Sequence, residues 1–301
     1  MKVYTRKPEE NWIVDRLVQE FSQKTSHQIV SNPENADVIF LLAGWIWNQV
    51  PIPLLQSKKV IKTIHHVVPE KFNKQEFNFC DQFIDLYHVP NKHTKAFLET
   101  QTKKPIKQIC YWLNDKLFFE TKESKKEKDK IVLFNNYRDT EGAGISKGIY
   151  LPKKEKGADI MAQVFCQLRK DKYSVLLTGY RRHFIIEELK KIKMSYSYME
   201  MAKNPNEAYS FADYFISCSR HEGGSQAILE SSQTKTKILS TDVGIASEIL
   251  HPDCLCYSID DFVDKIENNK IEETIEWNYE NVQNYTLDKM IKKYDKMIEE
   301  L

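Results

Sequence analysis

The sequence predicts an α/β protein of two domains, each built around a parallel β-sheet. Apolar runs of strand length alternate with segments of helical period along most of the 301 residues, and this alternation is typical of parallel sheets with crossover helices. The chain is also longer than most single domains. An almost entirely charged segment at residues 120–130 interrupts the alternation. We therefore expect one parallel-sheet domain on each side of this linker.

The first series of elements is read from the apolar pattern before the linker. Trp12, Leu17 and Phe21 belong to a set of apolar residues that recur at helical spacing. Short aliphatic runs fit buried strands, and Asn91 is a suitable N-cap for the helix that follows it. The expected strands are residues 1–4, 36–42, 59–65 and 81–90, and the expected helices are residues 10–23 and 91–99.

A second series of the same kind follows the linker. The expected strands are residues 130–134, 173–178, 213–219 and 238–241, and the expected helices are residues 158–169 and 184–192. In parallel sheets of this kind, ligands bind at the carboxyl ends of the strands. The loops that follow these strands are therefore the first places to look for a site.

The composition excludes several classes of protein. A formal net charge of +1 argues against bulk nucleic-acid binding, which depends on a large positive surplus. No run of about eighteen apolar residues appears, and the first residues form a strand pattern rather than a signal peptide. The six cysteines contain no C-x-x-C pair, so reduced and mostly buried thiols are expected. These features predict a cytoplasmic protein, with peripheral contact at the inner membrane face left open.

The most informative local pattern joins a strand, a glycine turn and a helix. The apolar run at residues 213–219 precedes Glu-Gly-Gly-Ser at residues 222–225, and an apolar helix pattern that contains Glu230 follows. The first N–H groups of such a helix suit a phosphate, and glycine lets a ligand approach the backbone. Ser225 is the expected N-cap. The pattern predicts a site for a phosphorylated ligand, with one carboxylate at the reactive end and the other at a vicinal diol such as a ribose.

The same stretch resembles the donor-binding signature of family 4 retaining glycosyltransferases, which have the GT-B fold. The resemblance covers residues 219–230 and continues through residues 238–249. Further features similar to that family follow in the family's order, and the whole is strongest in the second domain. They are the His65-His66 loop, the Lys156-Gly157 helix entrance, the segment at residues 208–213 and a terminal helix at residues 277–301.

The resemblance implies two Rossmann-like domains that face each other across a cleft. It gives the acceptor side to residues 1–120 and the nucleotide-sugar donor site to residues 121–280, with a helix at residues 281–301 that packs back on the first domain. The implied enzyme is a hexosyltransferase that moves a sugar, with retention, from a UDP- or GDP-sugar to a glycan or lipid-linked glycan. Bacterial surface polysaccharide, including lipopolysaccharide, is the acceptor class that the family most often serves.

The reaction itself indicates which residue types the site needs. Negative charge grows on the leaving diphosphate, so fixed cations and helix N–H groups stabilise the transition state. Arginine can fork onto phosphate oxygens, and lysine supplies a compact charge. The resemblance makes His65 and Glu222 the catalytic candidates. It assigns donor binding to Arg138, Lys156, Gly223, Gly224, Ser225, Glu230 and Gly244.

One departure from the family pattern concerns the two cations. The family's arginine and lysine usually lie close together in sequence, whereas here residues 139–155 separate Arg138 from Lys156. This extra segment contains a second Lys-Gly pair at residues 147–148. It therefore stays open whether Arg138 or a residue of the extra segment meets the diphosphate.

Other departures leave two further functions open. Residues 3–8 contain no glycine where the family often has a glycine-rich loop, and Ile245 follows Gly244 where the family often has glycine. A non-catalytic nucleotide- or glycan-binding module and a nucleotide-sugar epimerase are the alternatives. The chain has no Asp-x-Asp pair, so we expect no metal and no other cofactor, with the nucleotide sugar as a substrate. No nucleic-acid partner is expected.

Overall fold

The computed structural model describes residues 1–121, 129–200 and 204–301. The chain divides into two compact units: unit 1 comprises Met1–Trp112 and Tyr285–Leu301, and unit 2 comprises Leu113–Asn284. The first part of unit 1 ends at Trp112, whereas the sequence predicts that the first domain runs to residue 120. Residues 122–128 of the expected charged linker lie outside the described residues.

Within the described residues, unit 1 holds a six-stranded sheet in the order β2-β1-β3-β4-β5-β6, and its pairings are parallel. Both faces of the sheet are covered by apolar side chains from helices, which is why the run at residues 38–41 is continuously apolar. The strands are β1 (Lys2–Tyr4), β2 (Gln28–Val30), β3 (Val38–Leu41), β4 (Lys59–Thr63), β5 (Leu86–Val89) and β6 (Ile106–Gln108). The helices are α1 (Ile13–Lys24), α2 (Ile52–Ser57), α3 (Lys74–Asp81), α4 (Lys92–Glu99) and α12 (Leu287–Glu299).

The expected strand at residues 81–90 is wrong in its first half. Asn73 accepts a hydrogen bond from the backbone of Glu76 and caps α3, which runs to Asp81. Phe77 and Cys80, three residues apart, are both buried on one face of this helix, a helical and not a strand spacing. The predicted cap at Asn91 is confirmed, since its side chain accepts from the backbone of Thr94.

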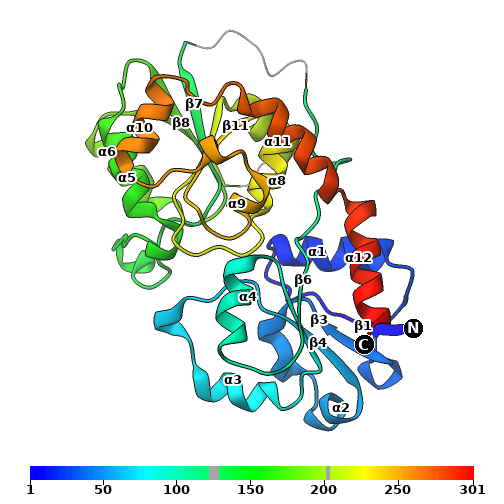
Figure 1. Cartoon of the computed structure of the whole chain (residues 1–301). Helices are drawn as coiled ribbons and strands as arrows, with labels where there is room; N and C mark the ends of the chain where they lie inside the picture. Colours follow the sequence, from blue (N-terminus) through cyan, green and yellow to red (C-terminus); the bar gives the residue numbers. More distant parts are fainter. Residues whose placement is uncertain (122–128, 201–203) are drawn as a thin grey trace. The chain divides into compact units, whose positions relative to one another are not determined.

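The expected terminal helix at residues 277–301 is two helices. α11 (Thr274–Val282) belongs to unit 2, a 3₁₀ turn at Gln283–Tyr285 follows, and α12 belongs to unit 1. α12 lies beside α1 (Figure 1), and both contribute to one hydrophobic cluster. Asp295 of α12 accepts hydrogen bonds from the hydroxyl of Thr25 and, at 2.9 Å, from the backbone of Ser26. The end of the chain is therefore an integral part of unit 1.

Unit 2, as described, contains a five-stranded parallel sheet in the order β11-β10-β7-β8-β9. Its strands are β7 (Ile131–Asn135), β8 (Tyr173–Thr178), β9 (Ser195–Met199), β10 (Tyr214–Ser217) and β11 (Lys237–Ser240). Its further helices are α5 (Ala158–Gln167), α6 (His183–Lys191), α7 (Pro205–Phe211), α8 (Gln226–Gln233), α9 (Ala246–Ile249) and α10 (Ile259–Glu267). Figure 1 shows α5, α6 and α10 on one side of this sheet and α8 and α11 on the other.

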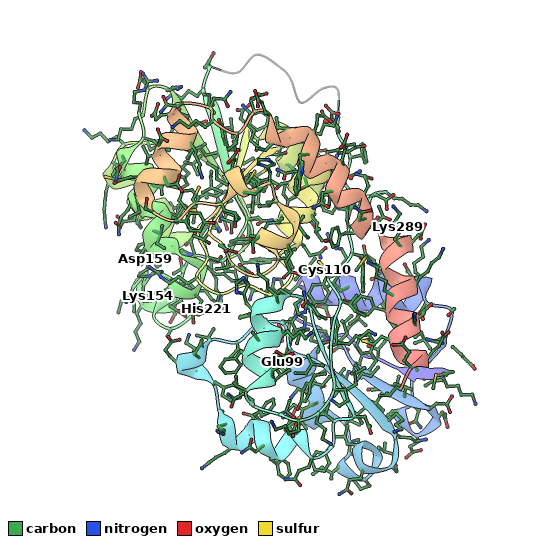
Figure 2. The ribbon with its side chains drawn as sticks, in the orientation of Figure 1. Glu99, Cys110, Lys154, Asp159, His221 and Lys289 are labelled. Atoms are coloured by element: carbon green, nitrogen blue, oxygen red, sulfur yellow. The ribbon has the colours of Figure 1, made fainter. Side chains whose placement is uncertain are left out.

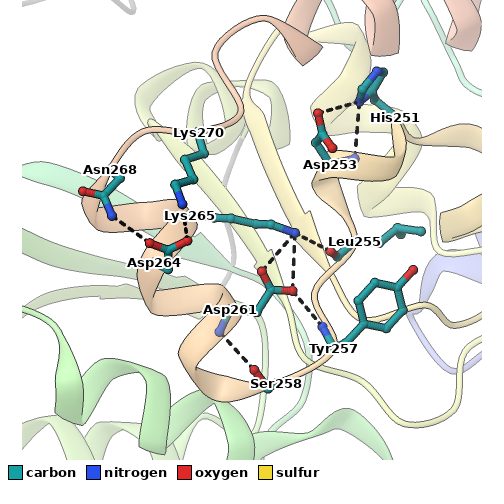
Figure 3. Close-up of polar contacts among 10 residues, drawn as sticks. All are labelled: His251, Asp253, Leu255, Tyr257, Ser258, Asp261, Asp264, Lys265, Asn268 and Lys270. Atoms are coloured by element: carbon teal, nitrogen blue, oxygen red, sulfur yellow. Dashed lines mark hydrogen bonds and ion pairs between the residues drawn. The ribbon is translucent and has the colours of Figure 1, made fainter.

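The segment after β11 is fixed by the first turn of α10 (Figure 3). Ser258 caps the helix by accepting from the backbone of Asp261, whose carboxylate accepts from the backbone of Tyr257. Lys265 pairs with Asp261 at 3.1 Å and also donates to the carbonyl of Leu255 at 2.6 Å. These contacts hold the chain between β11 and α10 against the helix that covers the sheet. None of the described helices combines the length and the apolar character needed to span a bilayer.

A buried histidine makes the stability of unit 1 sensitive to acid. His88 on β5 contacts the Thr63 hydroxyl, the Ile109 carbonyl and the Tyr294 hydroxyl. Burial lowers the pKa of His88 from 6.5 to about 4. Below pH 6.5 the unfolded chain binds a proton that the folded protein does not, so stability falls with falling pH until about pH 4.

We therefore expect His88 to contribute about 1.4 kcal/mol to the loss of unfolding free energy between pH 7.5 and pH 5.5. Urea unfolding of wild type and His88→Gln at the two pH values measures this contribution. The variant is expected to be less stable at both pH values, because it disturbs the buried contacts, but to lose less stability on acidification. An equal loss in both proteins would contradict the assignment.

Candidate active site

The sheet of unit 2 changes its winding direction between β7 and β10. β8 and β9 are added on one side of β7, whereas β10 and β11 are added on the other. The loops that leave the carboxyl ends of two such strands diverge, and ligands bind in the crevice between them. Arg138 follows β7 and Glu222 follows β10. The fold therefore brings two of the predicted site residues to the same edge of the sheet.

The extra segment at residues 139–155 leaves this edge and returns to it. Asp139 and Lys153 meet at its base, where the Lys153 amide donates to the Asp139 carbonyl at 2.7 Å, and Thr140 and Pro152 form an antiparallel bridge. A buried ion pair between Asp139 and Arg182, 3.1 Å between Nε and Oδ2, anchors this base to the start of α6. The two ends of this segment therefore lie close together, although they are far apart in the sequence.

Lys156 and Glu222 form the central ion pair of the site. Lys156 Nζ lies 2.7 Å from Glu222 Oε1, and both side chains are largely buried. The Ser219 hydroxyl donates to the same carboxylate oxygen at 2.8 Å. The catalytic candidate and the diphosphate candidate of the sequence analysis are therefore direct partners in the ligand-free protein.

A second ion pair locks the two loops that carry this pair. Arg220 binds Asp159 through two hydrogen bonds of 2.6 and 2.8 Å, and it also donates to the Lys154 carbonyl. The backbone of His221 donates to the Glu155 carbonyl at 3.1 Å. Figure 2 shows Lys154, Asp159 and His221 together in one corner of unit 2. The contact lowers the pKa of Asp159 through its hydrogen bonds with the guanidinium.

Two glycines permit this close packing. Gly157 has φ +61°, and a Cβ there would lie 1.6 Å from the carbonyl oxygen of Cys218 at the end of β10. Gly244 has φ +57°, and its Cβ would lie 2.4 Å from the Gly223 carbonyl and 2.9 Å from Glu222 Cβ. Only glycine fits either place without moving the backbone. The structure explains Gly244 by packing under the glutamate loop, and its donor contact stays a prediction, as does that of Gly224.

Tyr137 is one of the site residues that the sequence did not predict. Its ring lies 5.5 Å from Lys156 Nζ, and its hydroxyl contacts the hydroxyl of Ser225. Burial raises the pKa of Tyr137, and the charges of Glu222 and Glu230 raise it further. Ser225 is the N-cap of α8 as predicted, but its side chain makes no cap hydrogen bond. The sequence did offer one signal for Tyr137: it lies two residues after β7, at the edge where parallel sheets bind ligands.

Glu230 is buried on α8 and is held by a tyrosine. The Tyr209 hydroxyl donates to Glu230 Oε2 and accepts from the Asn136 side chain at 2.9 Å. Asn136 follows β7, so this chain of contacts leads from Glu230 back to the switch point of the sheet. The predicted ribose contact of Glu230 stays a prediction, and Tyr209 would orient the carboxylate.

Three cations lie near one another on the β7 side of the site. Burial lowers the pKa of Lys153, and the nearby charges of Lys156 and Arg138 lower it further. Lys153 belongs to the extra segment, so the structure adds it to the residues that can meet a diphosphate. The described residues contain no cluster of three or more His, Cys, Asp or Glu side chains that could hold a metal ion.

His65 belongs to unit 1 and has both ring nitrogens engaged. Nε2 lies 2.8 Å from the Leu42 carbonyl, which can only accept, so Nδ1 accepts from the Tyr111 hydroxyl at 2.6 Å. Burial lowers the pKa of His65 from 6.5 to about 3, and His66 and His88 lower it as well. The imidazole is therefore neutral at physiological pH. Its catalytic role stays a prediction.

Comparison with known families supports the same reading of unit 2. Residues 148–269 match the family model described as Glycosyl transferases group 1. The predicted resemblance to these glycosyltransferases is confirmed, and the matched range contains Lys156, Glu222, Glu230 and Gly244. The narrower assignment to family 4 stays a prediction.

Curated relatives are matched over part of their length. The chain is 24% identical over 156 residues to the O-antigen biosynthesis glycosyltransferase WclY of Escherichia coli. The match covers 49% of this chain and 44% of that protein, so the chain spans less than half the length of the curated relatives it matches.

Solved structures share the fold at low sequence identity. Anabaena Alr3699/HepE in complex with UDP and glucose has a TM-score of 0.78 and 10% identity, with 100% of this chain and 99% of that chain covered. Sucrose-phosphate synthase (tll1590) from Thermosynechococcus elongatus has a TM-score of 0.71 and 14% identity, with 88% and 73% covered. The predicted GT-B fold, with two parallel-sheet α/β domains, is confirmed.

Proposed function

We propose, from the group 1 glycosyltransferase domain over residues 148–269, that this chain transfers a sugar from a nucleotide diphosphate sugar to a glycan acceptor. The observation that carries the proposal is the Lys156–Glu222 ion pair at the switch point of the sheet of unit 2. It supplies a cation where the leaving diphosphate gains charge and a carboxylate beside it. Both features match what transfer from a nucleotide sugar requires.

The diphosphate would be held by the cation group of Arg138, Lys153 and Lys156, together with the first N–H groups of α8. In the ligand-free protein Lys156 is already paired with Glu222. A diphosphate that binds Lys156 competes with this carboxylate, so Glu222 becomes available to accept hydrogen bonds from the donor sugar. The ion pair would thus couple donor binding to the placement of Glu222.

The remaining predicted residues complete the donor site. Glu230, oriented by Tyr209, would accept from the ribose hydroxyls. His65 would serve as a neutral hydrogen-bonding group near the reacting bond, and for that purpose it exchanges its contact with Tyr111. Gly223 and Gly224 allow the donor to approach the turn before α8.

The relatives suggest which donor and acceptor classes to test first. HepE was solved with UDP and glucose, which makes UDP-glucose the first donor to test. The WclY match suggests an O-antigen type of glycan or its lipid-linked precursor as the acceptor. We further propose a retaining hexosyl transfer in the cytoplasm, with peripheral membrane contact where the acceptor is lipid-linked.

Thermal-shift measurements with nucleotides test the proposal. UDP or GDP, and the matching nucleotide sugars, are expected to raise the melting temperature far more than uridine or guanosine, because most contacts are to the diphosphate. Turnover of the stabilising nucleotide sugar with a glycan pool is then expected. Binding without turnover would favour a non-catalytic module, and an unchanged melting temperature with every nucleotide would reject the proposal.

We expect donor turnover to be independent of divalent metal. The chain has no Asp-x-Asp pair, and the Arg138, Lys153 and Lys156 cations can neutralise the diphosphate. The rate in EDTA is therefore expected to stay within about twofold of the rate of the untreated enzyme. A change of this size corresponds to much less than the 1.36 kcal/mol of barrier that a tenfold change in rate represents. A loss that Mn²⁺ or Mg²⁺ restores would contradict this prediction.

A further inference from the structure

Unit 1 contains a pocket of about 330 Å³ beside the carboxyl end of β4. The last residues of β4, the loop that follows and the first turns of α3 form its wall, including Lys62, His66, Lys71 and Phe72. The carboxyl ends of strands are the edge at which parallel sheets bind ligands. The residues that line this pocket all belong to unit 1.

Lys62 is the unusual residue of this pocket. The side chain leaves the middle of a sheet and the residue is only 8% exposed. Nζ lies 3.0 Å from Cys80 Sγ and 5.5 Å from the centre of the Trp47 ring. Among the residues that the structure describes, no ion pair joins Lys62 to a carboxylate. A buried ammonium group without an anionic partner is strongly unfavourable.

The two groups that do contact Lys62 are not anions. Burial raises the pKa of the Cys80 thiol and outweighs the lowering by the Lys62 ammonium group, so the sulfur stays protonated and serves as a weak acceptor. The Trp47 ring contributes a cation–π contact, which is weaker than a charged partner. Gly44 permits this contact, because a Cβ there would lie 2.0 Å from the Thr63 carbonyl and 3.3 Å from Lys62 Cγ. The helical turn that carries Trp47 is thus packed directly on the end of β4.

Two further basic side chains and an asparagine line the pocket with Lys62. His66 and Lys71 line the same pocket, and Asn73 caps the start of α3 at its edge. Glu76 is the carboxylate of the lining; like Lys71 it is exposed, and its side chain accepts from the Asn73 amide at 3.5 Å. An anion in the pocket would therefore meet a buried ammonium group and two further basic side chains.

We propose that this pocket binds a compact oxyanion, a phosphate or a carboxylate, and that Lys62 is its main contact. The assignment of this oxyanion to the acceptor rests on the proposed function, because in that function unit 2 holds the donor. The acceptor would then be acidic, with a phosphate or a uronic-acid carboxylate seated beside β4. Ligand binding supplies the counter-charge that the folded protein lacks.

Titration calorimetry of the full chain with inorganic phosphate and with glucuronate tests the proposal, with glucose as the neutral comparison. Lys62→Met keeps the length of the side chain and removes its charge. Lys59→Met is the matched control, since Lys59 starts the same strand but is exposed and pairs with Asp85 at 3.5 Å. Lys156→Met identifies phosphate that binds at the donor site of unit 2.

Phosphate, glucuronate or both are expected to bind wild type, Lys59→Met and Lys156→Met, and to bind Lys62→Met about tenfold or more weakly. The better of the two probes identifies the acidic group. Equal affinity for Lys62→Met and wild type, or binding of neither oxyanion, would overturn the proposal. If glucose binds as tightly as glucuronate, the pocket does not require a negative charge, and the proposal would be wrong.

Thermal melts without ligand provide an independent readout. Lys62→Met is expected to melt at or above the temperature of wild type, because it removes an unpaired buried charge. A clear decrease in melting temperature would show that the protein itself satisfies the ammonium group, and would also overturn the proposal. UDP affinity is expected to be the same in Lys62→Met and wild type. If no variant binds UDP, the donor proposal fails while the phosphate result still stands.

Discussion

Gly157→Ala is expected to abolish donor binding and to lower the free energy of unfolding by about 3 kcal/mol or more. The added methyl group would overlap the Cys218 carbonyl, with a Cβ to oxygen distance of 1.6 Å, and the residue already has φ +61°. Either the end of β10 or the start of α5 must move. Both movements separate Lys156 from Glu222, so the site is lost together with part of the stability.

Gly148→Ala is the matched control for this substitution. Gly148 also has a positive φ, +69°, but nothing lies within 4 Å of a Cβ at that position. We expect a cost of only about 1 kcal/mol from the backbone conformation, with UDP binding retained. Urea unfolding and calorimetry with UDP measure both effects. Similar results for the two variants would mean that the pair at residues 156–157 is not the lysine–glycine element of the donor site.

Lys156→Met is expected to weaken UDP binding by about ten- to a hundredfold and to leave the much weaker binding of uridine nearly unchanged. The lost contacts are to the diphosphate, which uridine lacks. Lys154→Met is the matched control, because Lys154 is exposed, lies two residues away and loses the same charge. Calorimetry with both ligands decides the question. Equal losses for UDP and uridine would remove Lys156 from the diphosphate site.

Variants of the Lys156–Glu222 pair can distinguish an effect on folding stability from an effect on UDP binding. Lys156→Met leaves the largely buried Glu222 without its ammonium partner, which destabilises the folded protein. The double variant Lys156→Met/Glu222→Gln also removes the carboxylate charge that has lost its ammonium partner, so it is expected to recover stability but not UDP binding. A double variant that regains UDP affinity would show that the single substitution acted through misfolding of the loop.

The central strands of both sheets were predictable because burial on both faces demands continuous apolar runs. β3 is such a run, and β8 and β10 each contain a shorter one, so the sequence alone located them. The missed strands β2, β6 and β9 form sheet edges. Their residues are mostly exposed or half-buried, so they carry no such run. Their pairing depends on a neighbouring strand that is distant in sequence.

The candidate site divides in the same way. The glutamate turn and the Lys156-Gly157 helix entrance are local patterns whose residue types follow from backbone geometry and charge, so the sequence alone identified them. The tertiary structure decided which groups meet. Asp139 and Lys153 join the two ends of the segment at residues 139–155. Lys156 pairs with Glu222. Tyr137 and Tyr209 lie beside this pair and beside Glu230, respectively. Contacts between loops that follow different strands depend on the order of strands in the sheet, which no local pattern of residues encodes.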